Sequence, residues 1–259
     1  MTLRAKTREI IDLVEEKSGI PVRVTKDPAL KTLANVRMAR GNMPVHLVTY
    51  NPKIETEPDY LICYQCGFIL RLFDCPPSKR FSFAAEEDGW KKVEELIAAE
   101  NENSSWKNIP EDVTNRFCRE LFDGLMLQIR SVPVGLRVDT WLRKDYPELK
   151  DLQEKSTAGQ LEENREVLSP DIKKVTPAKV YEATLAMNAA FSIFWDEILN
   201  EPRLSLPFKA TKYWEKGKKL MEIWKEIPSG PGEDYKLVNS WADELTLSGW
   251  YRWIPYSNA

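Results

Sequence analysis

The sequence predicts an α+β protein with a small antiparallel three-stranded sheet near its N-terminus and a mostly helical remainder. A helical pattern followed by three strand-like runs occupies the first fifty residues, and longer segments with apolar residues at helical spacing come after them. Hydrophobic residues make up 42% of the 259-residue chain, which is enough for a substantial core. We therefore expect a globular protein.

The first quarter of the chain follows the order helix, strand, strand, strand, helix. Gly19 is a natural stop for the first helix, and Asn51-Pro52 closes the third strand because proline cannot extend a β-ladder. The expected bounds are 4–18 for the first helix, 21–25, 33–40 and 45–50 for the strands, and 57–72 for the second helix.

The rest of the chain is predicted to be helical, with one polar interruption. We expect helices over 86–100, 111–129, 177–199 and 209–227, the second of which ends before Pro133 and Gly135. Residues 146–176 are charge-dense with little periodicity, which favours a mobile connector or arm carrying one short helix. This gives an α+β domain over 1–145, the connector, and a helical, Trp-rich region over 177–259.

Composition excludes several classes of function. A single histidine, His46, rules out any site that needs two or three imidazoles. The formal charge of −3 gives no strong nucleic-acid signature, and no run is long and apolar enough to suggest a membrane span. The charged N-terminus lacks the apolar stretch of a secretory signal, and the four cysteines are too few for a disulfide scaffold. We expect a cytoplasmic protein with reduced thiols.

The helix after the third strand carries the most informative motif. It contains Tyr64-Gln65-Cys66-Gly67-Phe68 followed by Ile-Leu, and it comes shortly after the Asn-Pro turn. This arrangement resembles the minimal scaffold of ImmA/IrrE-type zincin metallopeptidases, in which the corresponding helix carries His-Glu-x-x-His, often as His-Glu-x-Gly-His-Ile-Leu. In that register Tyr64 and Phe68 stand at the two histidine positions and Gln65 stands at the glutamate position.

A second motif agrees with the same register. Members of that family supply a third zinc ligand from a later helix resembling Glu-x-x-Ala-Asn-x-Phe-Ala-x-Glu-Leu-Leu. This chain has Glu111 near the ligand position, followed in matching order by Asn115, Phe117, Glu120 and Leu121. The resemblance covers residues 4–130 and implies a cleft near Tyr64, Gln65, Phe68 and Glu111, which His46 could approach from the neighbouring strand.

The departures from the family pattern argue against hydrolysis. Phenylalanine cannot bind a metal, and glutamine has no titratable group with which to act as a base. Because His46 alone cannot rebuild the site, the resemblance implies a pseudoenzyme that needs no cofactor. We therefore expect a non-catalytic binding or regulatory protein that acts through a protein partner. The family further suggests stress response or mobile-element and phage-related regulation.

Other interpretations of the same residues stay open. The helix over 57–72 can be an ordinary core helix in which Gly67 allows close packing. Cys63 and Cys66, spaced i and i+3, are typical of a reactive thiol pair or half of a metal-thiolate site, which Cys75 and Cys118 could complete, although buried cysteines are common core residues. A structural subunit that docks a partner through its aromatic C-terminal half is the third possibility.

Overall fold

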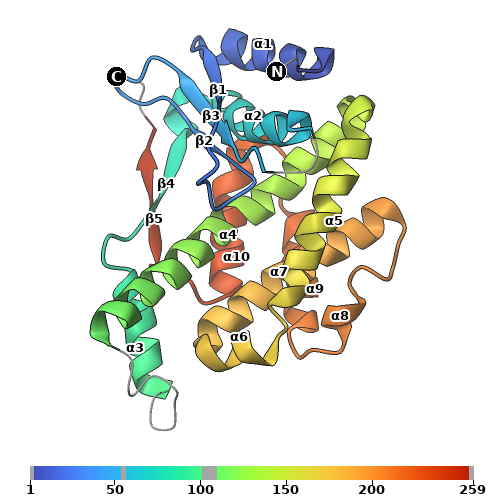
Figure 1. Cartoon of the computed structure of the whole chain (residues 1–259). Helices are drawn as coiled ribbons and strands as arrows, with labels where there is room; N and C mark the ends of the chain where they lie inside the picture. Colours follow the sequence, from blue (N-terminus) through green and yellow to red (C-terminus); the bar gives the residue numbers. More distant parts are fainter. Residues whose placement is uncertain (1–2, 54–56, 101–109, 257–259) are drawn as a thin grey trace.

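The computed structural model describes residues 3–53, 57–100 and 110–256. It confirms the α+β class. Helices α1 and α2 lie with a three-stranded sheet at one end of the molecule, while α4, α7, α9 and α10 form a helical body, and strands β4 and β5 run along its side (Figure 1). Among the described residues, none of the helices combines the length and hydrophobicity that crossing a lipid bilayer requires.

The N-terminal elements follow the predicted order. Gly19 ends the first helix in the left-handed conformation, with φ of 70°, and its N–H donates to the carbonyl of Glu15. The bounds are α1 Ala5–Ser18, β1 Val22–Lys26, β2 Ala34–Arg37, β3 His46–Tyr50 and α2 Asp59–Phe73.

The three-stranded sheet is mixed and not antiparallel, which corrects the prediction. Its order is β1-β3-β2, so the last strand lies in the middle, parallel to β1 and antiparallel to β2. The reason is topological: β1 and β2 do not pair with each other, and β3 inserts between them. Strand alternation places His46, Val48 and Tyr50 on the face that packs on the helices.

The remaining elements are mostly helices. Their bounds are η1 Pro77–Lys79, β4 Phe81–Ala85, α3 Trp90–Glu100, α4 Glu111–Asp145, η3 Pro147–Leu149, α5 Lys150–Glu166, α6 Pro170–Val175, α7 Ala178–Leu199, α8 Leu206–Lys209, α9 Trp214–Glu226, η4 Pro231–Glu233, α10 Asp234–Glu244 and β5 Tyr251–Pro255. Thus the helix predicted over 177–199 is confirmed, and the one predicted over 209–227 is shorter at its start.

Helix α4 continues through Pro133, where the sequence predicted its end. An interior proline costs a helix about 3 kcal/mol because it removes one hydrogen bond and crowds the preceding turn. Here Pro133, Val134 and Leu136 are all buried, and the indole N–H of Trp224 donates to the Pro133 carbonyl at 3.0 Å. Tertiary packing therefore overrides the local preference, and the helix is 35 residues long.

Residues 146–176 are helical as well, which corrects the expected connector. Helix α5 buries Leu152, Gln153, Thr157 and Leu161, and Leu152 belongs to the core shared with α2. Two of these four residues are polar, so the buried side of α5 lacks the apolar periodicity by which an amphipathic helix is recognised.

The hydrophobic core does not divide at the expected domain boundary. The largest buried cluster combines residues of α3 and α4 with residues of α7, α9 and α10. Strand β4 pairs antiparallel with β5, which joins residues 81–85 to 251–255. Helix α4 contributes Val138 and Leu142 to the second cluster, which contains the sheet, α1 and α2.

Two glycines allow α2 and α4 to cross closely. A Cβ atom at Gly67 would lie 2.4 Å from Cγ1 of Val138, and one at Gly135 would lie 1.9 Å from the Tyr64 hydroxyl. Because real Cβ atoms do not approach other heavy atoms this closely, the two helices can cross at this distance only if both positions are glycine. Val138 lies against Gly67 of α2, and Tyr64 lies against Gly135 of α4.

We predict that Gly67→Ala destabilises the protein by about 1–3 kcal/mol, the usual effect of overpacking a filled core. Val138 is β-branched and buried, so it cannot turn away without disturbing its neighbours. The matched control is Gly124→Ala, at an exposed position of α4 with no atom near the added methyl group, which should gain about 0.5–1 kcal/mol. Urea unfolding measures both, and equal stabilities for the two variants would contradict the close crossing.

Candidate functional site

The position of α2 is set at its first residue. The Asp59 carboxylate is 2% exposed and accepts hydrogen bonds from the backbone N–H of Arg4 at 2.7 Å and the hydroxyl of Thr7 at 2.6 Å. A carboxylate in the first turn of a helix also interacts favourably with the helix dipole. Both donors belong to the N-terminal segment, so Asp59 fixes α2 against α1.

Tyr64 and Phe68 lie on the face of α2 that packs against α4. Together with Tyr60 they form a column of aromatic rings at i, i+4 and i+8, with ring centroids 5.9 Å apart for the first pair and 5.3 Å for the second. The Tyr64 hydroxyl lies at Gly135 of α4, and both Tyr64 and Phe68 are half-buried. Aromatic rings therefore occupy the space between the two helices.

Gln65 and His46 lie near the sheet, on different parts of it. The side-chain amide of Gln65 donates to the carbonyl of Ala34 on β2 at 3.3 Å. His46 is fully buried on β3, where its Nδ1 accepts from the N–H of Ala39 at 3.0 Å and its ring packs against Phe73. Burial lowers the pKa of His46 to about 4, so the imidazole is neutral at physiological pH.

The five residues expected to form a cleft are only partly brought together. Tyr64, Gln65 and Phe68 are neighbours on α2. His46 instead packs against Phe73, which lies about 13 Å along that helix from Tyr64 at 1.5 Å per residue. Glu111 is the exposed first residue of α4, about 36 Å along that helix from the contact at Gly135. Helix α4, which begins at Glu111, does contact Tyr64, but it does so through its C-terminal half, at Gly135.

The carboxylate that α4 presents near α2 is Asp139. It is 3% exposed and accepts hydrogen bonds from the Tyr60 hydroxyl at 2.6 Å and from the side-chain amide of Gln153 at 3.0 Å. Burial raises the pKa of Asp139 to about 6, against the lowering effect of the two hydrogen bonds. The site thus contains one acid that changes charge near neutral pH.

Sequence reasoning missed Asp139, Tyr60 and Gln153. The one signal for Asp139 is a carboxylate inside the mostly apolar run of residues 134–142. That signal was lost because the helix was expected to end at Pro133. Gln153 gave no signal, since it stands in a segment that was interpreted as solvated.

All four cysteines are buried, and their environment disfavours reaction of the thiols. Cys63 and Cys66 are inaccessible in the core between α1, α2 and the sheet, while Cys118 belongs to the other cluster. Burial raises the pKa of Cys63 to about 12 and also raises that of Cys66, which disfavours the reactive thiolate. Within the described ranges, no group of three or more His, Cys, Asp or Glu side chains is arranged to hold a metal ion.

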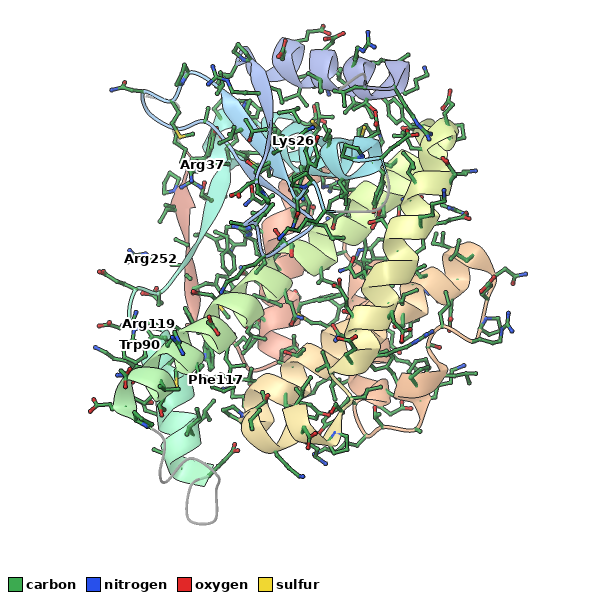
Figure 2. All side chains as sticks on the ribbon, viewed as in Figure 1. Lys26, Arg37, Trp90, Phe117, Arg119 and Arg252 are labelled. Atoms are coloured by element: carbon green, nitrogen blue, oxygen red, sulfur yellow. The ribbon has the colours of Figure 1, made fainter. Side chains whose placement is uncertain are left out.

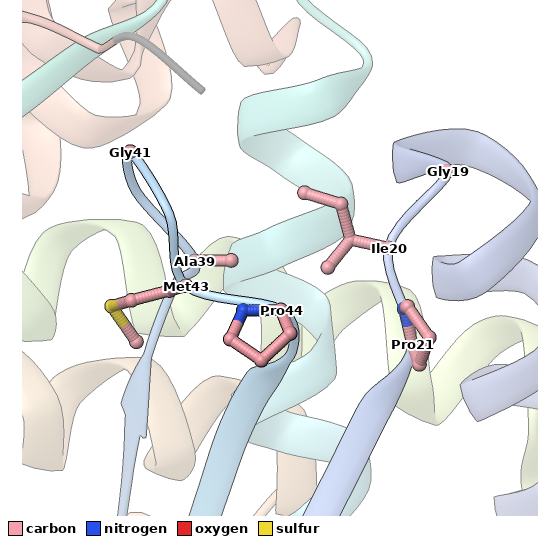
Figure 3. Close-up of a pocket in the computed structure, with 7 residues that line it drawn as sticks. All are labelled: Gly19, Ile20, Pro21, Ala39, Gly41, Met43 and Pro44. Carbon is pink, nitrogen blue, oxygen red and sulfur yellow. The ribbon is translucent and has the colours of Figure 1, made fainter. Parts of the chain in front are cut away.

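A surface pocket of about 310 Å³ lies elsewhere, between the α1–β1 turn and the β2–β3 loop (Figure 3). Its lining consists of glycine, proline, alanine, isoleucine and methionine side chains, none of which can transfer a proton or bind a metal through a charged group. The side chains that line this pocket therefore provide no acid, base or charged metal ligand.

Comparison with known proteins found no relative. No protein-family model matches the sequence, and no curated protein and no solved structure is significantly similar to it. The zincin-like interpretation therefore remains a prediction from the two sequence motifs.

We predict that Asp139 makes stability fall as the pH rises from about 4 to about 6. An acid whose pKa is higher in the folded protein keeps its proton there after the unfolded chain has lost it. The stabilising effect of the proton is complete below the ordinary aspartate pKa of 3.8 and is lost as the pH passes about 6, a change of about 3 kcal/mol.

The measurement is urea unfolding of wild type and Asp139→Asn across this pH range. Asparagine keeps an oxygen that accepts from Tyr60 but cannot ionise, so the difference between the proteins isolates this carboxyl group. A difference that stays constant from about pH 4 to about pH 7 would show that Asp139 ionises normally.

We also predict that native thiols react slowly. With a thiol-specific reagent near pH 8, fewer than about one cysteine per chain should react in the first minute, because all four are buried. In guanidinium chloride all four should react at once. Two fast thiols that decrease to one in Cys66→Ser would instead favour the thiol or metal-thiolate function.

Proposed function

We propose that this chain is a non-catalytic binding or regulatory protein on a scaffold that resembles a zinc metallopeptidase but has lost its metal site and its hydrolytic activity. The observation that carries the proposal is the contact between α2 and α4. The two positions that would need imidazoles carry Tyr64 and Phe68, and the Tyr64 ring lies directly against Gly135.

The chemistry of the neighbouring groups supports this function. Metal-assisted hydrolysis needs nitrogen, sulfur or carboxylate ligands with an open coordination position, and a base to receive the proton of the bound water. Gln65, at the position of the base, donates its amide to the edge strand β2. Asp139 is already hydrogen-bonded to Tyr60 and Gln153, so this carboxylate is committed to a closed polar network.

Recognition of a protein partner is the remaining use of this region. Tyr64, Gln65 and Phe68 are partly exposed, and Gln65 reaches the edge strand β2. Tyrosine and phenylalanine supply large contact areas at little entropic cost, which is why aromatic residues are enriched at interfaces. We place such a partner in the cytoplasm, in stress response or in the regulation of mobile elements or phage.

The test compares wild type with Gln65→Ala in two measurements. Purified wild-type protein should contain less than about 0.1 zinc per chain, show no peptidase activity and keep its Tm in the presence of EDTA, because the residues that the structure describes include no cluster of three metal-binding side chains. Protein partners captured by wild type from the native lysate should be depleted by Gln65→Ala, since that side chain lies on the rim of α2.

The matched control is Gln160→Ala, the same change at an exposed position of α5. It should leave the captured proteins unchanged. Stoichiometric zinc together with peptidase activity that Gln65→Ala abolishes would overturn the non-catalytic function. Identical capture by all three proteins would overturn recognition at α2.

A further inference from the structure

The charge of this protein is strongly segregated along the chain. Residues 20–53, which contain the whole three-stranded sheet, carry six basic residues and one acidic residue, a formal charge of +5. The complete chain has a charge of −3, so the remaining residues carry −8. The six basic residues are Arg23, Lys26, Lys31, Arg37, Arg40 and Lys53, and the acid is Asp27. The net charge of the whole chain therefore does not reveal that the sheet-bearing segment is basic.

The sheet presents its charge on one face. Helices α1 and α2 pack against the side that carries Val48, and alternation directs the intervening residues to the other side. There the register places Leu47 of β3 between Arg23 of β1 and Arg37 of β2. Both arginines are exposed, and two strand spacings separate their Cα atoms by about 10 Å.

A second row on the same face is polar and uncharged. It consists of Thr25, Thr49 and Asn35 on the three adjacent strands, and the two threonine hydroxyls are 3.1 Å apart. Arg23 and Arg37 form no ion pair with any described carboxylate, and neither does Lys26 at the end of β1. Lys26 pairs in register with Tyr50 and therefore belongs to the helix-packed side of the sheet. The open face thus carries two arginines on either side of Leu47, next to a row of hydroxyl and amide groups.

The basic surface continues beyond the sheet. Arg40, in the loop after β2, lies over the ring of Tyr256, which follows β5. Desolvation, and after it the charge of Arg40, lower the pKa of Arg130 on α4, so the charges of these two arginines repel each other. Figure 2 labels Lys26 and Arg37 at the sheet and Arg252 on β5. Lys31 is paired with Glu120, whereas Arg23, Arg37 and Arg40 form no ion pair with a described carboxylate, and such unpaired like charges favour an anionic partner.

We propose that the open face of the β1-β3-β2 sheet binds the phosphate backbone of a nucleic acid. Guanidinium groups bind phosphate through paired N–H donors, and threonine and asparagine side chains are common donors to phosphate oxygens. The face offers no apolar pocket for the side chains of an acidic peptide and no aromatic ring for stacking on a base. Contacts to the backbone, independent of sequence, are what this surface can supply. The proposal does not depend on the filled α2–α4 contact, which lies on the other side of the sheet.

The test is fluorescence polarisation with a labelled single strand of about 20 nucleotides and the matching duplex, between about 50 and 200 mM salt. Wild type should bind at least one of them, with an affinity that falls steeply as salt rises. Arg23→Gln with Arg37→Gln should weaken binding about tenfold or more and reduce the salt slope by about 1.4 for a single strand, as expected for two lost phosphate contacts.

The control variant, Lys155→Gln with Lys173→Gln, removes the same charge from exposed positions of α5 and α6 and should bind as wild type does. An unchanged Tm checks that each variant is folded. The proposal is overturned if wild type binds neither probe at low salt or if both double variants lose affinity equally. It is also overturned if labelled poly-glutamate of matched length binds as tightly as the nucleic acids, which would identify an acidic protein segment as the partner.

Discussion

The close crossing of α2 and α4 is the constraint on which the rest of the structure depends. Gly67 and Gly135 bring the helix axes near enough for Val138 and Tyr64 to interlock. Since α4 contributes to both hydrophobic clusters, this contact is one of those that join the sheet-bearing part to the helical body. Any larger residue at either glycine would have to separate two cores at once, which a close-packed interior resists.

Polar groups around the crossing make its geometry specific. Asp234 at the start of α10 accepts hydrogen bonds from Arg71 of α2 and from Arg137 of α4, so one carboxylate ties three helices together. On the other side, Asp139 binds Tyr60 and Gln153 and ties α4 to α2 and α5. Breaking either set would leave buried polar atoms unpaired, which costs more than the bonds themselves contribute. The crossing is thus fixed by directional contacts as well as by packing.

The sequence predicted those features that depend on residues close together in the chain. The alternation in β1, β2 and β3, the glycine after α1 and the proline after β3 are short-range signals, and those elements lie where they were expected. The strand order, the pairing of β4 with β5 and the continuation of α4 through Pro133 depend on contacts between distant residues. The same limit applies to the site. The helix that carries Tyr64 and Phe68 was predicted from its local pattern, whereas the position of Asp139 depends on which half of α4 faces α2.

The interior and the surface of this protein carry different kinds of reactive group, and this limits the functions that each can support. Aromatic rings and a hydrogen-bonded acid fill the crossing of α2 and α4, so little room remains there for a substrate to reach a reactive group. Unpaired charges lie on the outside, among them Arg23 and Arg37, which are exposed on the two outer strands of the sheet on either side of Leu47. Packing against the helices fixes the strands, and with them the Cα positions of the two arginines, while the exposed side chains still lose rotamer freedom when they bind a ligand. The proposed non-catalytic role and the proposed phosphate-binding face are compatible in one fold, because the first concerns the crossing of α2 and α4 and the second the opposite side of the sheet.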